Sequence, residues 1–131
     1  MPETTKPRPK GRRWTHNLDV IGLNFRWKKE NRAVLAATVA KGSITGIRLV
    51  REPDNQYDPN AVAVYLPERL YDGKQLGYIG RESAAILAPK LDAGTLVAES
   101  VMLLGLRENN GHPNACGSML VRFRDVPAKK S

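Results

Sequence analysis

The sequence predicts a mainly β fold with two inserted helices, arranged as a small and partly closed barrel. Five or six short apolar segments alternate with turn residues, as strands do, and two longer segments have helical spacing. The connections between the strand segments are too short for repeated crossover helices, which argues against a parallel sheet. A chain of 131 residues can bury a single core, so we expect one domain.

The N-terminal half supplies a first strand and a first helix. Residues 18–23 alternate partly between apolar and polar side chains and predict a strand. Residues 28–40 are rich in good helix formers, and Lys41 and Gly42 follow as a basic last turn and a glycine cap. We therefore expect a helix that ends before Gly42.

Two strands, a loop and a short further strand come next. Apolar residues between 44 and 51 predict a second strand, and the alternation at 61–66 predicts a half-buried one. Residues 67–74 read as a loop with its turn at Asp72-Gly73, and a short strand is expected at 76–79.

The C-terminal part predicts a second helix and a final pair of strands. The helix begins at Arg81, with Glu82 near the positive end of the backbone dipole, and closes at residues 92–94. Pro89 has no amide donor, so we expect it to break or kink the helix near its end. The strands are expected at 96–106 and 118–123, with a turn at 109–114.

Positive charge is concentrated at the two ends of the chain. The net charge is +8, but residues 14–121 hold 12 basic and 11 acidic residues and contribute only +1. Residues 1–13 offer nothing to bury, so we expect a disordered basic arm there, a domain at 14–125 and a frayed tail at 126–131. A polyanion would meet these ends first, although basic ends also serve simply to keep a protein soluble.

Two features bear on the cellular compartment. No segment reads as a secretory signal or as an apolar membrane span. Cys116 is the only cysteine, so no internal disulfide can form, which suits a reducing compartment. We expect a cytoplasmic protein of a bacterial- or phage-like kind, with no membrane partner.

The first candidate binding segment is the polar turn at residues 52–60. Asp, Asn and Pro are typical turn residues, so this segment could be a purely structural loop. Tyr57 is a ring with no role in a turn, and aromatic side chains on loops stack on unpaired bases with about 1–3 kcal/mol per base. The acids and amides around it suit binding of a sugar hydroxyl.

Two further groups are candidates for contacts with nucleic acid. Tyr78 and Arg81 could be ordinary packing and a solvated charge, but the first-turn amides of a helix attract phosphate and Arg81 stands beside them. Phe25, Arg26 and Trp27 interleave rings with charge, as single-strand contact surfaces do. The alternative is that Phe25 and Trp27 pack one face as the helix begins.

Signals for catalysis are poor. The sequence has no phosphate-binding loop of the G-x-x-x-x-G-K-[ST] type, so it gives no support for ATP-driven work. His16 and His112 have no nucleophile or carboxylate pair at a recognisable spacing, and His112 with Cys116 gives too few ligands for a closed zinc site. We expect no enzyme, no cofactor and no bound metal.

The order E-P-D-N-x-Y-D-P-N-A-V-x-V at 52–64, followed by L-G-Y-I-x-R-E at 76–82, resembles the HIRAN family, and the resemblance extends over residues 20–123. It implies a modified OB-like, six-stranded β-barrel with two helices that recognises the 3′-hydroxyl end of single-stranded DNA. Members of the family are often fused to helicase-type motors that act on stalled replication forks. This chain encodes no motor, so the resemblance implies that such an activity would come from a separately encoded partner.

The resemblance also implies residue roles. Tyr57 would stack on the terminal base, Asp58 would accept a hydrogen bond from the 3′-hydroxyl, and Asn55 would help to fix the terminal nucleotide. Tyr78 and Arg81 would line the path of the backbone. The sequence departs from the family pattern in three places. Asn24-Phe25 or, with a shift of one or two residues, Arg26-Trp27 stands where an arginine and an aromatic are expected. Tyr78 stands where some DNA-binding members carry a histidine, and a stacking ring expected in the last hairpin falls near Cys116, which cannot stack.

The leading hypothesis is therefore a non-enzymatic module that binds 3′-hydroxyl ends of single-stranded DNA in repair or replication-fork processing. The alternative is a protein-interaction module that docks a helicase or nuclease without binding DNA itself. The first predicts a preference for a 3′-hydroxyl over a 3′-phosphate end, whereas the second predicts no saturable DNA binding at physiological salt.

Overall fold

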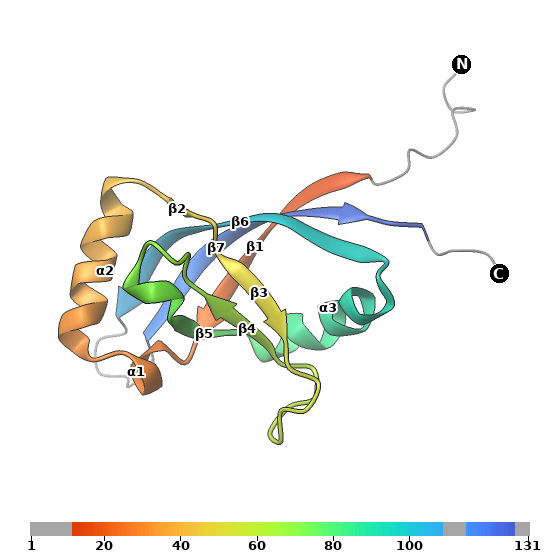
Figure 1. Ribbon diagram of the computed structural model, residues 1–131, viewed down its shortest axis with the longest axis horizontal. Coiled ribbons are helices and arrows are strands. Elements are labelled where there is room, and N and C mark those ends of the chain that lie inside the picture. The colour runs from red at the N-terminus through yellow and green to blue at the C-terminus, as the bar shows by residue number, and fades with distance from the viewer. Residues whose placement is uncertain (1–11, 109–114, 128–131) are drawn as a thin grey trace, which may run out of the picture.

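The computed structural model describes residues 12–108 and 115–127, which form one curled antiparallel sheet with helices at its sides (Figure 1). The elements in chain order are β1 (Arg13–Ile21), α1 (Leu23–Arg26), α2 (Lys29–Lys41), β2 (Ile44–Thr45), β3 (Arg48–Arg51), β4 (Val62–Tyr65), the 3₁₀ turn η2 (Tyr71–Gly73), β5 (Gln75–Ile79), α3 (Arg81–Ala93), β6 (Leu96–Glu108) and β7 (Ala115–Asp125).

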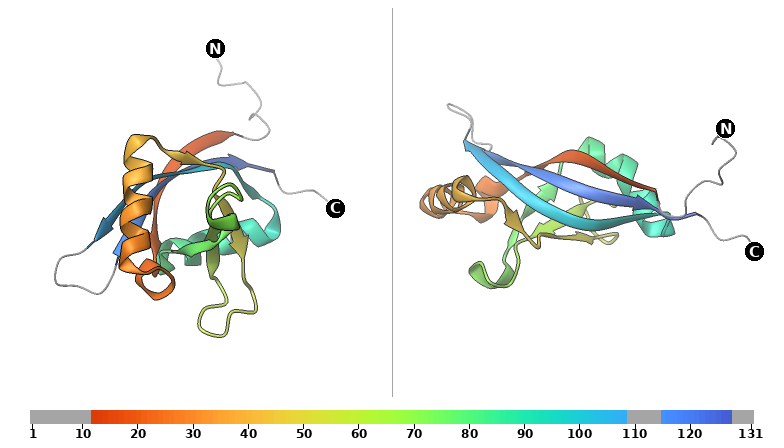
Figure 2. Two further views of the ribbon diagram at one scale, coloured as in Figure 1. Left: turned by 60° about the vertical axis from the view of Figure 1, so that its left-hand side comes forward. Right: turned by 90° about the horizontal axis from the view of Figure 1, so that it is seen from above.

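The sheet curls because one segment supplies both of its edges. Among the described residues it has seven strands in the order β2-β6-β7-β1-β5-β4-β3. β2 and β3 follow one another in the chain and are separated by a bend at Gly46, whose φ of 81° suits glycine. β2 pairs with β6 and β3 pairs with β4, so the two ends of the sheet are drawn together into a half-barrel (Figure 2).

The predicted fold class is confirmed, with a different strand count. The protein is mainly β with two main helices, as expected for an OB-like fold. The described strands number seven rather than six, because the single strand predicted at 44–51 is divided at Gly46 into β2 and β3.

Three long strands form the most continuous part of the sheet. β1 pairs with β7 from Arg13↔Arg124 to Val20↔Gly117, and β7 pairs along its length with β6. The pairing continues one residue before β1, where the amide of Asp125, the last residue of β7, donates to the carbonyl oxygen of Arg12 at 2.8 Å.

β1 and β7 lie at the two limits predicted for the domain, residues 14 and 125. β1 begins at Arg13, inside the segment predicted as an arm, and the amide of Val126 in the predicted tail donates to Thr95 at 2.9 Å. The turn predicted at 109–114, most of the predicted arm and the last four residues of the tail lie outside the described residues.

The core lies between the long strands and the two main helices. Leu18 and Val20 of β1 are buried, as are Met119, Val121 and Phe123 of β7, so every second residue of these strands points inward. Burial of such a side chain stabilises the fold by roughly 1.5–3 kcal/mol. The helices add further buried side chains to this cluster, namely Leu35, Val39, Ala84, Leu87 and Ala88.

The helices begin and end close to their predicted limits. α2 is followed by Gly42, and α3 ends at Gly94, which adopts the left-handed conformation of a glycine cap. Of the break or kink predicted at Pro89, the break does not occur, because α3 continues to Ala93. Its last turn is held from outside, since Arg51 donates two hydrogen bonds to Asp92 at 2.7 and 2.8 Å. None of the described helices has the length and apolar character needed to span a bilayer.

Candidate nucleic-acid interface

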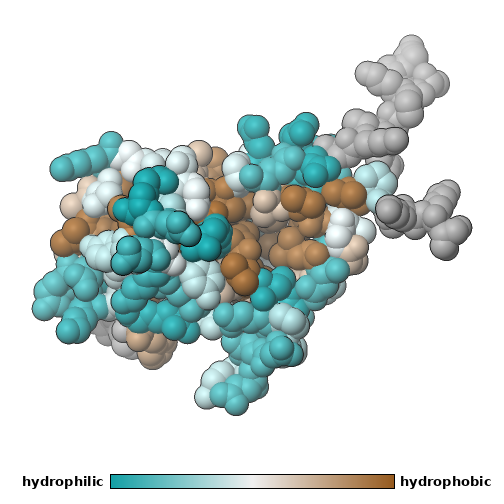
Figure 3. All heavy atoms as spheres, viewed as in Figure 1, coloured by the Kyte–Doolittle hydropathy of each residue, from teal (hydrophilic) through white to brown (hydrophobic). Residues whose placement is uncertain are grey.

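The loop between β3 and β4 is shaped by its own side chains. Its base is closed where the amide of Glu52 donates to the carbonyl oxygen of Ala61 at 3.0 Å. Inside it, Oδ1 of Asn55 accepts hydrogen bonds from the amides of Tyr57 at 2.9 Å and Asp58 at 3.0 Å. An asparagine side chain that bonds the backbone two and three residues ahead is a common means of fixing a turn. The loop projects from the body of the molecule and is covered by hydrophilic groups (Figures 1 and 3).

Tyr57 stands at the exposed part of this loop. Its side chain is 81% exposed, although a ring of this size is usually at least half-buried. The rest of the loop does not need the ring for packing, so its face is available to a flat ligand. The ring predicted as a stacking platform therefore has the exposure that stacking requires.

Asp58 lies at the inner side of the loop and remains accessible. Its Oδ1 accepts a hydrogen bond from the amide of Asn60 at 2.9 Å, which leaves Oδ2 facing Nε of Arg81 at 3.7 Å. The side chain keeps 20% of its exposure, whereas that of Arg81 keeps 76%. Arg81, the first residue of α3, also donates to the carbonyl oxygen of Tyr57 at 3.2 Å and so ties the helix to the loop.

A second set of contacts connects the loop to β5. The hydroxyl of Tyr78 donates to Oε1 of Glu52 at 2.9 Å, and Nδ2 of Asn55 donates to the same oxygen at 3.0 Å. Arg26 approaches from the other side, with its guanidinium carbon 5.4 Å from the centre of the Tyr78 ring and Nη2 at 3.4 Å from the hydroxyl. The carboxylate of Glu52 thus fixes both Tyr78 and Asn55.

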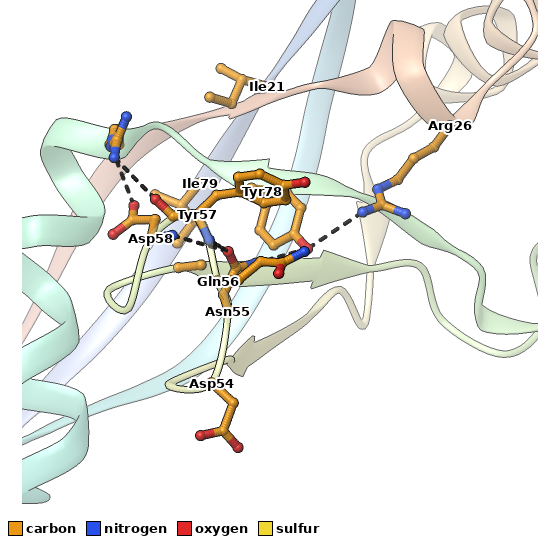
Figure 4. Close-up of a pocket in the computed structure, with 11 residues that line it drawn as sticks. Ile21, Arg26, Asp54, Asn55, Gln56, Tyr57, Asp58, Tyr78 and Ile79 are labelled. Carbon is orange, nitrogen blue, oxygen red and sulfur yellow. Dashed lines mark hydrogen bonds and ion pairs between the residues drawn. The ribbon is translucent and has the colours of Figure 1, made fainter.

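These side chains surround one open groove of about 590 Å³ (Figure 4). In the close-up, Arg26 and Asp58 stand at opposite sides, with Tyr57, Tyr78 and Asn55 between them. The groove is lined by Ile21, Arg26, Asp54, Asn55, Gln56, Tyr57, Asp58, Ala61, Tyr78, Ile79 and Arg81. It can therefore offer a ring face, a carboxylate, amides and two guanidinium groups to a single ligand.

Two glycines allow the elements around the groove to approach one another. Gly22 has a φ of 82° and turns the chain from β1 into α1, which carries Arg26. Gly77 precedes Tyr78, and a Cβ at this position would collide with the carbonyl oxygen of Ile21 on β1. A residue with a side chain at position 77 would therefore separate β5 from β1.

Six of the eight residues predicted for the site line the groove, and Phe25 and Trp27 do not. Trp27 is only 2% exposed, its Nε1 donates to the carbonyl oxygen of Gln75 at 3.0 Å, and its ring meets Tyr71 edge-on. Its predicted role as a contact for single-stranded DNA is therefore wrong, since no base can reach a ring in the core. Phe25, by contrast, is 82% exposed.

The eight predicted residues leave out five of the groove-lining residues, Ile21 among them, and also Glu52, which holds Tyr78 and Asn55 in place. Glu52 was read as part of a turn, although it is the acceptor that fixes Tyr78 and Asn55. Ile21 was read as a strand residue, although it is 41% exposed at the edge of the groove. The alternation of β1 was a usable signal for Ile21, because Leu18 and Val20 assign the odd positions to the outer face.

Comparison with known proteins assigns the chain to the same family as the sequence motifs at 52–64 and 76–82. Residues 15–111 match the HIRAN domain, a span that includes the whole groove. The chain belongs to the HIRAN domain family.

Sequence similarity to a curated protein is local. Over 64 residues the chain is 45% identical to a putative SWI/SNF-related matrix-associated actin-dependent regulator of chromatin subfamily A member 3-like 1 from Arabidopsis thaliana. The match covers 47% of this chain and 7% of that protein, so the chain corresponds to a small part of its relative.

Two solved structures share the fold. The HIRAN domain of human HLTF superposes with a TM-score of 0.54 and 21% identity, covering 82% of this chain and 74% of that one. A protein from Lactobacillus plantarum gives a TM-score of 0.51 and 20% identity, covering 86% of this chain and 97% of that one.

Proposed function

We propose that the protein binds the free 3′-hydroxyl end of single-stranded DNA in the groove beside the 52–61 loop, as a binding module in DNA repair or replication-fork processing. HIRAN domains are DNA-binding domains of chromatin remodelers. The observation that carries the finer proposal is that an exposed ring, Tyr57, and a partly exposed carboxylate, Asp58, face the same groove.

The groove offers a role for each predicted residue within it. Tyr57 stacks on the terminal base, and Oδ2 of Asp58 accepts a hydrogen bond from the 3′-hydroxyl. Asn55 orients the terminal nucleotide, while Arg26, Tyr78 and Arg81 line the path of the backbone. Phe25, exposed next to Arg26 in α1, is a candidate for a second stacking contact.

End specificity follows from charge. A carboxylate accepts a hydrogen bond from a neutral hydroxyl, but it repels a terminal phosphate at the same place. Because Oδ1 of Asp58 is already bonded to the amide of Asn60, Oδ2 is the oxygen that makes this distinction.

The test compares two short single strands that differ only in a 3′-hydroxyl or a 3′-phosphate, by fluorescence anisotropy. Asp58→Asn keeps an oxygen for the amide of Asn60 and removes the charge, so it should bring the two affinities together without unfolding the loop. Tyr57→Ala should weaken binding to both ends by about 1–3 kcal/mol, whereas Tyr57→Phe should retain most of the affinity because the ring remains.

Two results would reject the assignment. The first is equal binding of the unmodified protein to both ends, unaffected by Asp58→Asn. The second is the absence of saturable DNA binding at physiological salt, which would favour the docking of a protein partner such as a helicase or nuclease.

A further inference from the structure

The groove cannot by itself attract a polyanion. Its lining contains two arginines, Arg26 and Arg81, and two aspartates, Asp54 and Asp58, so their formal charges cancel. Arg81 is moreover engaged with Asp58 at 3.7 Å. Most of the affinity of proteins for DNA comes from neutralising phosphates, so a strand held in this groove needs positive charge from another part of the surface.

Such charge is present on the outer face of the long strands. The register places Arg13 of β1 opposite Arg124 of β7, and Thr15 opposite Arg122. The residues between them, Trp14 and Phe123, pack against each other with ring centres 4.8 Å apart. Because successive side chains of a strand alternate between its two faces, the three arginines share the outer face, which we call the basic sheet face.

The arginines of this face are only partly neutralised. Glu99 of β6 is the shared partner of Arg13 at 2.8 Å and Arg124 at 2.7 Å, so one negative charge serves two positive ones. Arg122 is exposed, and among the described residues it has no hydrogen-bond or ion-pair partner. In the sequence, the segments 1–13 and 122–131, which include these three arginines, together account for +7 of the net charge of +8.

The basic sheet face and the groove lie along the same strand. Ile21, at the far end of β1 from Arg13, lines the groove, and it points outward as Arg13 does because both occupy odd positions. The eight residue steps between them span about 26 Å at the usual rise of a strand. DNA rises 3.4 Å per base pair, so this length corresponds to about eight base pairs.

The character of this face favours a double strand. The outward positions of the described parts of β1 and β7 carry no phenylalanine, tyrosine or tryptophan that could stack on an unpaired base. Guanidinium groups neutralise phosphates, whereas unpaired bases are held chiefly by stacking on aromatic rings, and a duplex presents phosphates with its bases already stacked.

We propose that the basic sheet face, formed by Arg13, Arg122 and Arg124, binds the phosphate backbone of duplex DNA. The inference rests on the proposed function in one respect: the duplex is the part of the DNA that continues from the single-stranded 3′ end held in the groove. The module thus binds a junction between a duplex and a 3′ overhang. The groove at the Ile21 end of β1 recognises the 3′-hydroxyl terminus, and the arginines at the Arg13 end neutralise the phosphates of the duplex.

The test uses two probes, a short single strand that fills only the groove and the same strand as a 3′ overhang on a duplex longer than about eight base pairs. Arg122→Ala should weaken binding of the overhang duplex about twofold to fivefold at moderate salt, as expected for one exposed charge pair. It should also reduce the slope of log affinity against log salt by about 1. Binding of the short strand should not change.

Three further variants sharpen the comparison. Arg122→Lys keeps the charge and should bind the duplex nearly as well. Lys41→Ala removes the same charge at the end of α2 and should have no effect. Glu99→Gln frees Arg13 and Arg124 and should strengthen duplex binding, a gain that loss of structure could not produce.

The outcomes separate this inference from the proposed function. The assignment of the basic sheet face is overturned if Arg122→Ala and Glu99→Gln leave the affinity for the overhang duplex unchanged, or if they change the affinities for both probes equally. This conclusion does not depend on whether the protein prefers a 3′-hydroxyl or a 3′-phosphate end. If duplex binding responds to Arg122 and Glu99 as described, the inference stands, and a lack of discrimination between 3′ ends would then count against the groove alone.

Discussion

Single side chains in the 52–61 loop both build the site and face the ligand. Asn55 uses its oxygen to fix the turn around Tyr57 and its nitrogen to reach Glu52. Asp58 holds the amide of Asn60 with one oxygen and presents the other to the groove. Substitutions at these two positions will therefore alter loop shape and ligand contact together unless the replacement keeps the acceptor.

Glu52 offers a cleaner test of preorganisation, because it orients the site without being among the groove-lining residues. Glu52→Ala removes the acceptor shared by Tyr78 and Asn55, so it should lower affinity for 3′-hydroxyl and 3′-phosphate strands alike and leave their ratio unchanged. Glu52→Gln retains an acceptor oxygen and should bind nearly as well as the unmodified protein. Anisotropy with both strands gives the ratio, and a changed ratio in Glu52→Ala would show that Glu52 contacts the terminus directly.

At the residue scale, the sequence predicted the site residues that lie in one short segment. That segment forms the turn and also carries the side chains proposed to contact the ligand. Asn55, Tyr57 and Asp58 are close in the chain, and local turn chemistry is enough to bring them together. Phe25 and Trp27 show the opposite case. They are two positions apart, yet one is 82% exposed and the other 2%, because packing against β5 and Tyr71 selects Trp27 for the core.

At the scale of elements, the groove depends on how closely β5 approaches β1. Gly77→Ala places a methyl group against the carbonyl oxygen of Ile21, and we expect it to destabilise the fold by about 1–3 kcal/mol, as overpacked sites do. The change would also displace Tyr78, so DNA affinity should fall in the folded protein. Urea unfolding measures the first effect and anisotropy the second.

Gly80→Ala is the matched control, because a Cβ at position 80 meets nothing within 4 Å. Both variants add one methyl group, which has room at position 80 but not at position 77; Gly80→Ala also replaces the glycine N-cap of α3. Equal stability of the two would contradict the close approach of β5 and β1.

Element limits were predicted well where local signals set them and poorly where distant contacts did. Gly42 and Gly94 end the helices as glycine caps usually do. Pro89 was expected to break or kink α3, but the helix continues past it: Gly94 caps the following turn and Arg51 of β3 holds Asp92 within it. The segment 44–51 divides into two strands because its first part, β2, pairs with β6 and its second part, β3, pairs with β4. A local sequence pattern does not reveal such distant pairing.

At the scale of the whole molecule, two carboxylates connect separate parts of the fold and make stability depend on pH. Hydrogen bonds from Arg13 and then Arg124 lower the pKa of Glu99 below its ordinary value of 4.5, and a hydrogen bond from Arg51 lowers the pKa of Asp92 below 3.8. A lowered pKa in the folded state stabilises the protein above the ordinary value, and this contribution is lost as the pH falls through the lowered one.

We therefore expect stability to be insensitive to these two groups above about pH 5 and to fall with acid below it. Glu99→Gln and Asp92→Asn should be less stable than the unmodified protein at neutral pH, and the difference should shrink as the pH falls below the ordinary pKa values. Urea midpoints measured across this range test the expectation. A difference that stays constant with pH would show that the ion pairs do not contribute through ionisation.

The described chain begins and ends side by side, since the amide of Asp125 reaches the carbonyl oxygen of Arg12, and both lie away from the 52–61 loop (Figure 1). Neighbouring termini allow a domain to be spliced into a surface loop of an unrelated host with two short joints. Neither joint would have to pass over the cleft that holds Tyr57 and Asp58. This half-barrel is therefore suited to transplantation between hosts with its ligand site intact.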